Sequence, residues 1–163
     1  MTDTLPLVDD AQLMAVALDE ARAGLDHGDV PVGAVVIDPS GEVVARRHNE
    51  RELTGDPTAH AELLALRDAA ARVDGWRLDA HTLVVTLEPC PMCAGAALAA
   101  RVGTIVFGAW DPKAGACGSL YNLAADPRLN HEMTLVPGVL EQECASLLQV
   151  FFRERRGDQE MTL

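Results

Sequence analysis

The sequence predicts an α/β protein with three layers, in which a mixed five-stranded sheet lies between helices. The first observation is a hairpin of two short strand patterns near the start of the chain, which makes part of the sheet antiparallel. The second is that strand and helix patterns alternate after this hairpin, which is typical of parallel crossovers with helices on both faces of a sheet. The third is that 163 residues, 48% of them hydrophobic, suit one compact domain with a sizeable core.

The first half of the chain supplies a helix, the hairpin and a second helix. Asp9–Asp10 can cap a helix that continues to about His27, because leucine and alanine recur on one face of it. The turn sequence at residues 38–41 separates the two strands of the hairpin. Proline favours the first helical turn, so the next helix is expected to start near Pro57 and to end before Gly75. The expected strands are residues 32–37 and 42–47.

The second half of the chain alternates between strands and helices. Pro91 can open a helix that continues to about Ala100, and a last helix is expected from Glu141 to about Arg156. Residues 108–130 between them are expected to form a long loop, because glycine and proline break the periodic patterns there. The expected strands are residues 82–87, 104–107 and 134–136.

These elements lead us to expect a single domain over residues 1–156, followed by a frayed tail over residues 157–163. No apolar stretch is long enough for a membrane span, and the first ten residues lack the order of a secretion signal. We therefore expect a cytoplasmic protein without membrane association.

The chain is acidic, with a formal net charge of −12 from 13 Lys and Arg against 25 Asp and Glu. Taken alone, this charge argues against a nucleic-acid ligand, whose phosphates favour basic surfaces. The arginines are clustered, however, over residues 46–51 and 153–156. This clustering is compatible with a local basic surface on an acidic protein.

Two short motifs hold the candidate chemistry, His60-Ala61-Glu62 and Cys90-Pro91-Met92-Cys93. In a reducing compartment, a Cys-x-x-Cys pair near a His-x-Glu favours metal binding over disulfides. One imidazole and two thiols make three zinc ligands. A structural zinc site usually has four protein ligands, whereas a catalytic site keeps one position for water. Zinc lowers the pKa of that water toward about 7, and Glu62 can move protons beside it.

Both motifs are expected at the starts of helices. Cys90 and Cys93 are three residues apart, which places both sulfurs on one side of a first turn, where the helix dipole also lowers thiol pKa values. His60 is expected in the first turn of its own helix, although Glu62 would diverge from it by about 200° on a regular helix. Taken singly, Cys-x-x-Cys could be a redox pair and His-x-Glu a solvated helix turn. The combination favours a catalytic zinc site.

The sequence resembles the zinc-dependent cytidine/deoxycytidylate deaminase superfamily, whose signature is His-x-Glu followed by Pro-Cys-x-x-Cys. Within it, the sequence is most similar to the TadA family of bacterial tRNA-specific adenosine deaminases. The resemblance covers most of the chain, and it implies a cytidine-deaminase-like fold. The residues that carry it are 30–34, 49, 56–62, 86–96, 106–109, 118–120, 130–131, 143–145 and 151–153.

This resemblance implies hydrolytic deamination of adenosine to inosine at the wobble position of an arginine tRNA anticodon. One Zn²⁺ per subunit would be held by His60, Cys90 and Cys93, and zinc-activated water would attack C6 of adenine. Glu62 would pass the water proton to N1 and assist the departure of ammonia. The resemblance also implies a homodimer, for which the small-residue helix at 94–100 offers a close-packing face. Packing of that helix on the sheet explains its composition equally well.

The same resemblance implies contacts with the tRNA anticodon stem-loop. Asn49 would hydrogen-bond the purine edge. The remaining contacts are Val32, Leu87 and Ala109 in the base pocket, Asp111 and Lys113 at the flanking nucleotides, and Phe151 and Arg153 near the end of the chain. Each contact has a structural alternative. Asn49 could be a turn residue, and Val32, Leu87 and Ala109 could be core residues at strand ends. Asp111 and Lys113 could lie in a solvated loop, and Arg153 could belong to a charged helix end. Glu88 is expected to be a structural hydrogen-bond partner rather than a second catalytic acid.

Two other functions stay open at this point. One is deamination of a free nucleobase or nucleotide such as guanine, which related enzymes perform with the same Pro-Cys-Pro-Met-Cys pattern. The other is an RNA- or protein-binding module with a non-catalytic zinc.

Overall fold

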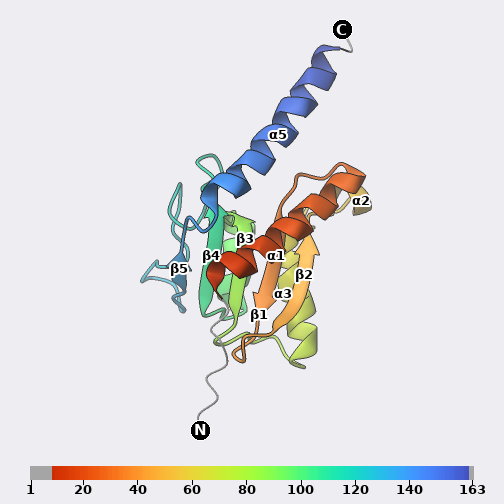
Figure 1. Ribbon diagram of the computed structural model, residues 1–163. Helices are drawn as coiled ribbons and strands as arrows, with labels where there is room; N and C mark the ends of the chain where they lie inside the picture. The colour runs from red at the N-terminus through yellow and green to blue at the C-terminus, as the bar shows by residue number, and fades with distance from the viewer. Residues whose placement is uncertain (1–8, 162–163) are drawn as a thin grey trace.

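The computed structural model describes residues 9–161, and it has three layers around one mixed sheet (Figure 1). Strands β1 and β2 form the antiparallel hairpin, and β1 also pairs antiparallel with β3. Strands β3, β4 and β5 are parallel, so the strand order is β2-β1-β3-β4-β5. The strands are β1 (Gly33–Ile37), β2 (Val43–His48), β3 (Thr82–Leu87), β4 (Thr104–Ala109) and β5 (Thr134–Val136). The predicted three-layer arrangement with a mixed five-stranded sheet is confirmed.

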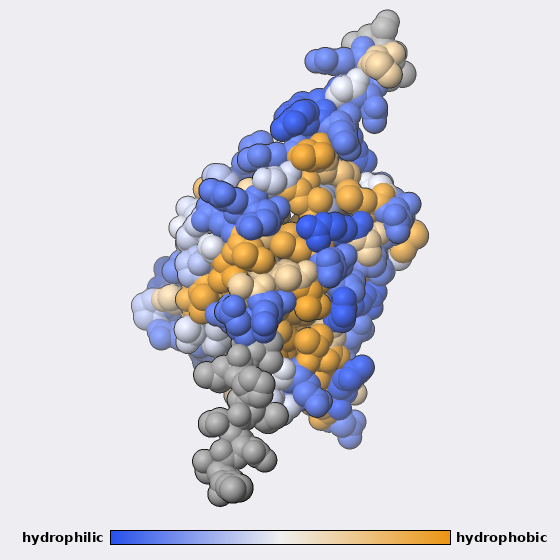
Figure 2. Space-filling model, in the orientation of Figure 1, coloured by the Kyte–Doolittle hydropathy of each residue, from blue (hydrophilic) through white to orange (hydrophobic). Residues whose placement is uncertain are grey.

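Two long helices cover each face of the sheet. Helices α1 (Asp10–Ala23) and α5 (Glu141–Glu160) lie on one face, and α3 (Ala61–Arg72) and α4 (Pro91–Ala99) lie on the other. A 3₁₀ turn, Gly24–His27, extends α1, and a short helix α2 (Arg51–Thr54) lies in the polar loop for which no helix was predicted. Figure 2 shows apolar surface over and between α1 and α5. No helix within residues 9–161 combines the length and the apolarity that a membrane crossing needs.

The core has two halves because side chains alternate across the pleated strands. Val35, Val84 and Val106 point toward α1 and α5. Their neighbours Val36 and Val85 point toward α3 and α4. The central strands are buried on both faces, as expected for a sheet covered by helices on two sides. This packing fixes the carboxyl ends of β2, β3 and β4, which candidate site residues follow in the sequence.

The helix that carries Glu62 begins later than predicted. Pro57 forms a turn rather than a first helical turn, because the Asp56 carboxylate accepts hydrogen bonds from the backbone N–H and the hydroxyl of Thr58. His60 has an extended backbone with φ −75° and ψ 147°, and α3 starts at Ala61. The prediction that His60 lies inside the first turn is therefore wrong, since it is the residue before that turn.

The last helix is longer than predicted. It runs to Glu160, so the prediction of a frayed tail from residue 157 is wrong for residues 157–160. Gly157 has a low helix propensity, but the glutamate, glutamine and arginine around it are good helix formers. The end of α5 projects beyond the body of the protein (Figure 1), and its surface is mostly hydrophilic (Figure 2). The final residues 162–163 and the first eight lie outside the described part of the chain.

Candidate active site and metal centre

Three potential metal ligands converge between the starts of α3 and α4. His60 precedes α3, Cys90 is the N-cap residue of α4, and Cys93 lies in the first turn of α4. The Nδ1 atom of His60 lies 3.7 Å from Sγ of Cys90 and 3.5 Å from Sγ of Cys93. The three donor atoms lie within 4.8 Å of one another. The predicted ligand set is therefore brought together by the fold.

The two nitrogen–sulfur distances fit a tetrahedral zinc ion. With Zn–N and Zn–S bonds of about 2.05 and 2.3 Å, a tetrahedral centre places its nitrogen and sulfur ligands about 3.6 Å apart. Both nitrogen–sulfur distances agree with this value to within about 0.1 Å. A three-ligand set of this kind leaves one tetrahedral position for water, as in catalytic zinc sites.

Glu62 lies beside the three ligands as the second residue of α3. Its side chain is 4% exposed, and its Oε2 atom has no hydrogen-bond partner in the described chain. Burial raises the pKa of the Glu62 carboxyl to about 7. The extended backbone of His60 explains how both side chains reach one site, because the two residues do not share a regular helical turn. An unpartnered carboxylate oxygen beside a three-ligand centre is suited to exchanging protons with a water held there.

The two cysteines are electronically distinct before any metal is considered. A hydrogen bond from the Cys93 thiol, followed by the contact with His60, lowers the pKa of the Cys90 thiol to about 4. Cys90 also lies at the amino end of α4, where the helix dipole favours an anion. A lowered pKa favours the thiolate of Cys90, which is the form in which cysteine binds metal.

A pocket of about 210 Å³ opens onto His60, Glu62 and Cys90, whereas Cys93 lies buried behind it. Its lining also includes four of the predicted substrate-contact residues. The lining residues are Val30, Val32, Asn49, Arg51, His60, Glu62, Leu87, Glu88, Cys90, Asp111, Ala114 and Phe152. Arg51 and Phe152 were not predicted to contact substrate. In the sequence, Arg51 belongs to a cluster of arginines and Phe152 to a pair of phenylalanines. The sequence alone could not decide which member of each group faces the pocket.

The other predicted contact residues lie elsewhere. Ala109 is buried in the half of the core that faces α1 and α5 and is not among the residues that line the pocket, so its place in the base pocket stays a prediction. Phe151 packs edge-to-face on Phe152 and carries the Arg155 guanidinium over its ring, outside the pocket lining. Lys113 and Arg153 line a second, larger groove of about 610 Å³ beside the pocket.

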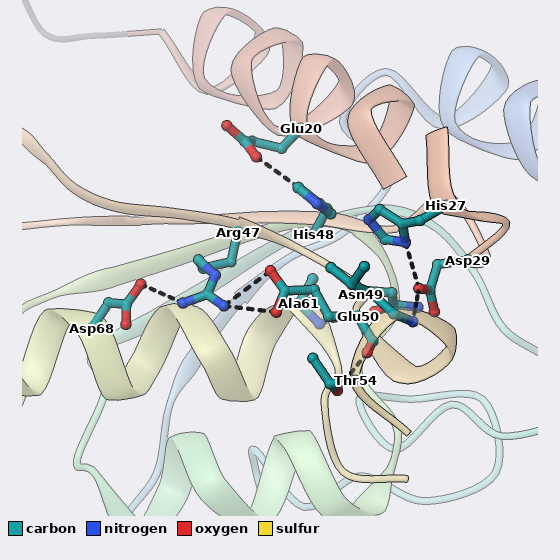
Figure 3. A network of polar contacts seen from close by, with 11 residues as sticks. Glu20, His27, Asp29, Arg47, His48, Asn49, Glu50, Thr54, Ala61 and Asp68 are labelled. Atoms are coloured by element: carbon teal, nitrogen blue, oxygen red, sulfur yellow. Dashed lines mark hydrogen bonds and ion pairs between the residues drawn. The ribbon is translucent and has the colours of Figure 1, made fainter. Parts of the chain in front are cut away.

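Asn49 is fixed by a polar network at the end of β2 (Figure 3). Its Oδ1 atom accepts a 2.8 Å hydrogen bond from the backbone N–H of Ala61, and the N–H of Glu50 donates to the carbonyl of Ala59. The backbone is thus tied on both sides of His60. In the described chain the Nδ2 amide group of Asn49 makes no hydrogen bond, so it is available as a donor to a molecule in the pocket.

Most of the first arginine cluster is paired with acids. Arg47 donates to both carboxylate oxygens of Glu50 at 3.0 Å and to Asp68 on α3 at 2.9 Å (Figure 3). Arg46 pairs with Glu20 on α1. Arg51, at the pocket, makes no ion pair with another described residue. Two of the three arginines in this cluster therefore have a structural role, and only Arg51 lines the pocket.

Glu88 organises the loop that closes the pocket. Its carboxylate is 1% exposed and accepts hydrogen bonds from the backbone N–H groups of Asp111, Cys117 and Ser119 and from the Ser119 hydroxyl. A side chain at Gly115 could not fit, because its Cβ atom would lie 2.2 Å from a Glu88 oxygen. The interpretation of Glu88 as a structural hydrogen-bond partner is confirmed.

Comparison with known proteins agrees with this geometry. The family model of the cytidine and deoxycytidylate deaminase zinc-binding region matches residues 7–109. The chain is 48% identical to the tRNA-specific adenosine deaminase of Bacillus subtilis over 92% of both chains. It is 42% identical to that of Haemophilus influenzae, over 93% of this chain and 88% of the relative.

Solved structures show the same relationship. A structure from a study of A-to-I editing by tRNA:A34 deaminases has a TM-score of 0.80 and 40% identity, over 83% of this chain and 98% of the other. A guanine deaminase from Nitrosomonas europaea has a TM-score of 0.77 and 27% identity, over 89% and 85%.

The metal-ligand geometry, the buried carboxylate and these similarities all indicate a zinc-dependent deaminase. The chain binds one Zn²⁺, and His60, Cys90 and Cys93 are the group of side chains in residues 9–161 that could hold it. The chain belongs to the cytidine and deoxycytidylate deaminase family and, within it, to the tRNA-specific adenosine deaminases, so it is a zinc-dependent hydrolase that acts on a carbon–nitrogen bond.

Proposed function

We propose that the protein converts adenosine to inosine at the wobble position of a tRNA anticodon, that of an arginine tRNA. The observation that supports this most is the convergence of three candidate zinc ligands and an unpartnered buried carboxylate at the floor of one small pocket, which His60, Cys90 and Glu62 line. The 48% identity to a tRNA-specific adenosine deaminase favours RNA over a free base as the substrate. Such a substrate would place the protein in the cytoplasm.

The side chains around the pocket have complementary roles in this reaction. When bound, Zn²⁺ supplies Lewis-acid activation of water. Glu62 accepts the proton that the water gives up through its unpartnered Oε2 atom and delivers it to N1 of the purine. The water oxygen replaces the amino group at C6, and ammonia departs. Asn49 donates from its amide group to an acceptor atom on the purine edge.

The size of the pocket suits one nucleobase rather than a whole nucleotide. Its volume of about 210 Å³ is below the range of roughly 300–1,000 Å³ that is typical of ligand pockets. In an anticodon loop the reacting base can be splayed out of the stack. Val32 and Leu87 would pack against this base. Lys113 and Arg153 would meet the RNA backbone in the adjacent groove.

The direct test compares two substrates on the zinc-loaded protein. We expect inosine to form in an arginine-tRNA anticodon stem-loop with adenosine at the wobble position, measured by nucleoside analysis of the digested RNA. The same loop with guanosine at that position tests the base specificity, and loops of other tRNAs with a wobble adenosine test the tRNA identity. Absence of inosine in every loop with a wobble adenosine would contradict the proposal.

Free guanine is the second candidate substrate, because the chain also shares its fold with a guanine deaminase at 27% identity. An ammonia-release assay with guanine separates the two functions. Release from guanine together with no inosine in RNA would favour this candidate.

We further propose that the protein is a homodimer. Support comes from an apolar groove of about 330 Å³ on the outer side of α3 and α4, whose lining includes Leu63, Ala96 and Ala99. This composition suits close packing of a second copy of the chain. Sedimentation should give twice the monomer mass of 17.4 kDa, and Ala99→Glu should give the monomer. A monomer for the unaltered chain would contradict the proposal.

A further inference from the structure

An exposed tryptophan stands at the wall of the groove beside the reaction pocket. Trp110 directly follows β4 and is 41% exposed, and Phe152 of α5, another lining residue, is 45% exposed. The groove of about 610 Å³ continues into the reaction pocket, because both are lined by Val30, Leu87, Asp111 and Phe152. A strand of RNA whose reacting base occupies the pocket therefore has its neighbouring nucleotide at this groove.

The Trp110 ring is held in place on its inner side. It packs edge-to-face on Phe107 of β4, with ring centroids 4.9 Å apart and an interplanar angle of 85°. Gly118 passes so close that a Cβ atom there would lie 3.0 Å from the ring, and its φ of +136° is one that residues with side chains rarely adopt. Phe107 and Gly118 thus hold the inner side of the Trp110 ring, and the rest of the ring faces the groove. A rigid aromatic surface of this kind loses little conformational entropy when a flat ligand stacks on it.

The charge of the groove is opposite to that of the whole chain. Lys113, Arg153 and Arg156 line it, and none of the three makes an ion pair with another described residue. Asp111 is the one acid in the lining, and its side chain accepts hydrogen bonds from the backbone N–H groups of Lys113 and Ala114. Three cations against one acid, on a chain with a net charge of −12, match a phosphate backbone.

Aromatic rings interleaved with cations are typical of surfaces that bind single-stranded nucleic acid. Bases stack on the rings, and the cations follow the phosphates. We propose that Trp110 is a base-stacking residue that holds a nucleotide directly next to the reacting adenosine, with Lys113, Arg153 and Arg156 at the adjoining phosphates. This inference rests on the proposed RNA substrate and adds a residue that determines binding of the flanking base.

The first test uses the intrinsic fluorescence of the two tryptophans in the chain. Trp76 is 59% exposed and lies after α3, on the other side of the sheet, with the Arg77 guanidinium over its ring. Trp76→Phe leaves Trp110 as the single tryptophan, and Trp110→Phe leaves Trp76. Both are combined with Glu62→Gln, which blocks turnover. We expect the anticodon stem-loop to quench the Trp110 emission saturably and to leave the Trp76 emission unchanged. Equal responses of both variants would overturn the proposal.

The second test changes the RNA first and the Trp110 side chain second. Stem-loops with an abasic site on either side of the wobble adenosine are compared with the intact loop on the Glu62→Gln protein. We expect one of the two abasic loops to bind about 10-fold more weakly, the size of one base–aromatic stack. In Trp110→Ala that difference should vanish, whereas Trp110→Phe should keep most of it. An abasic penalty of the same size in Trp110→Ala would overturn the proposal.

The outcomes separate this inference from the proposed reaction. For the active protein, Trp110→Ala should raise KM about 10-fold and change kcat little, with the melting temperature as a check on folding. If RNA quenches Trp110 but is never deaminated, the reaction is wrong and the stacking site stands. If RNA is deaminated and neither abasic loop loses affinity, the stacking site is wrong and the reaction stands.

Discussion

The metal centre and the groove beside it are built from different kinds of segment. The metal ligands and Glu62 come from two short motifs at the starts of α3 and α4, and Glu62 and Cys93 are almost fully buried. The groove is assembled from the residues after β4 and from one side of α5, and its aromatic rings are about half exposed. The difference indicates that the candidate metal centre depends on two short, buried motifs, whereas the groove depends on the relative placement of distant segments.

The largest effect is expected from loss of the metal. Cys93→Ala should lose zinc and more than about 1,000-fold of the turnover, because the metal contributes several kcal/mol to the activation of water. Its melting temperature should also fall, since the free energy of metal binding adds to that of folding. Metal analysis, turnover and thermal unfolding measure the three effects. Cys144→Ala is the matched control, because Cys144 is buried in the other half of the core. Full zinc content in Cys93→Ala would refute the ligand assignment.

The next largest effect is expected at Glu62. Glu62→Gln keeps the shape of the side chain but cannot accept a proton, so kcat should fall by about 10²–10⁴. Zinc content and affinity for the stem-loop should stay within about twofold, because the amide touches the reacting water rather than holding the metal or RNA. Glu42→Gln, at an exposed turn, is the control. Turnover close to that of the unaltered protein would rule out Glu62 as the proton carrier.

Glu88 connects the two regions and should give an intermediate effect. It lies two residues before Cys90, and its carboxylate holds the loop that carries Asp111 and Lys113. Glu88→Gln places an amide N–H₂ group against backbone donors, so the unfolding free energy of the zinc-loaded protein should fall by about 2–3 kcal/mol. KM for the stem-loop should rise more than kcat falls, because the loop borders the groove. Urea unfolding and steady-state kinetics measure these changes, with exposed Glu132→Gln as the control. Unchanged stability would show that the hydrogen bonds of Glu88 are not needed.

The smallest effect is expected at the outer end of the groove. The double variant Arg153→Gln, Arg156→Gln should bind the stem-loop several-fold more weakly at low salt. Each lost phosphate contact should reduce the slope of log affinity against log salt by about 1. Arg155→Gln is the matched control, because Arg155 lies on the same helix but over the Phe151 ring, outside the groove lining. If Arg155→Gln changes the slope as much as the double variant does, the two groove arginines have no special role.

Much of the fold and the centre of the site could be predicted from the sequence because the signals are local. Strand β3 has the predicted bounds, since a short apolar run between turn residues is a local pattern. His60, Glu62, Cys90 and Cys93 were predicted as a group, because metal ligation requires a fixed set of atom types at fixed spacings. The start of α3 was misplaced by four residues, because the hydrogen bonds between Asp56 and Thr58 outweighed the preference of Pro57 for a helix.

The sequence by itself determined the candidate group of metal ligands, the position of Glu62 next to it and the order of strands and helices. Only the tertiary structure decided that Ala109 lies in the core, that Phe152 rather than Phe151 faces the pocket, and that Arg46 and Arg47 are paired. It also decided that Trp110 meets α5 across a groove. The physical reason is that ligand spacing is set within a few residues of chain, whereas the direction of a side chain depends on packing between segments that lie far apart in the sequence.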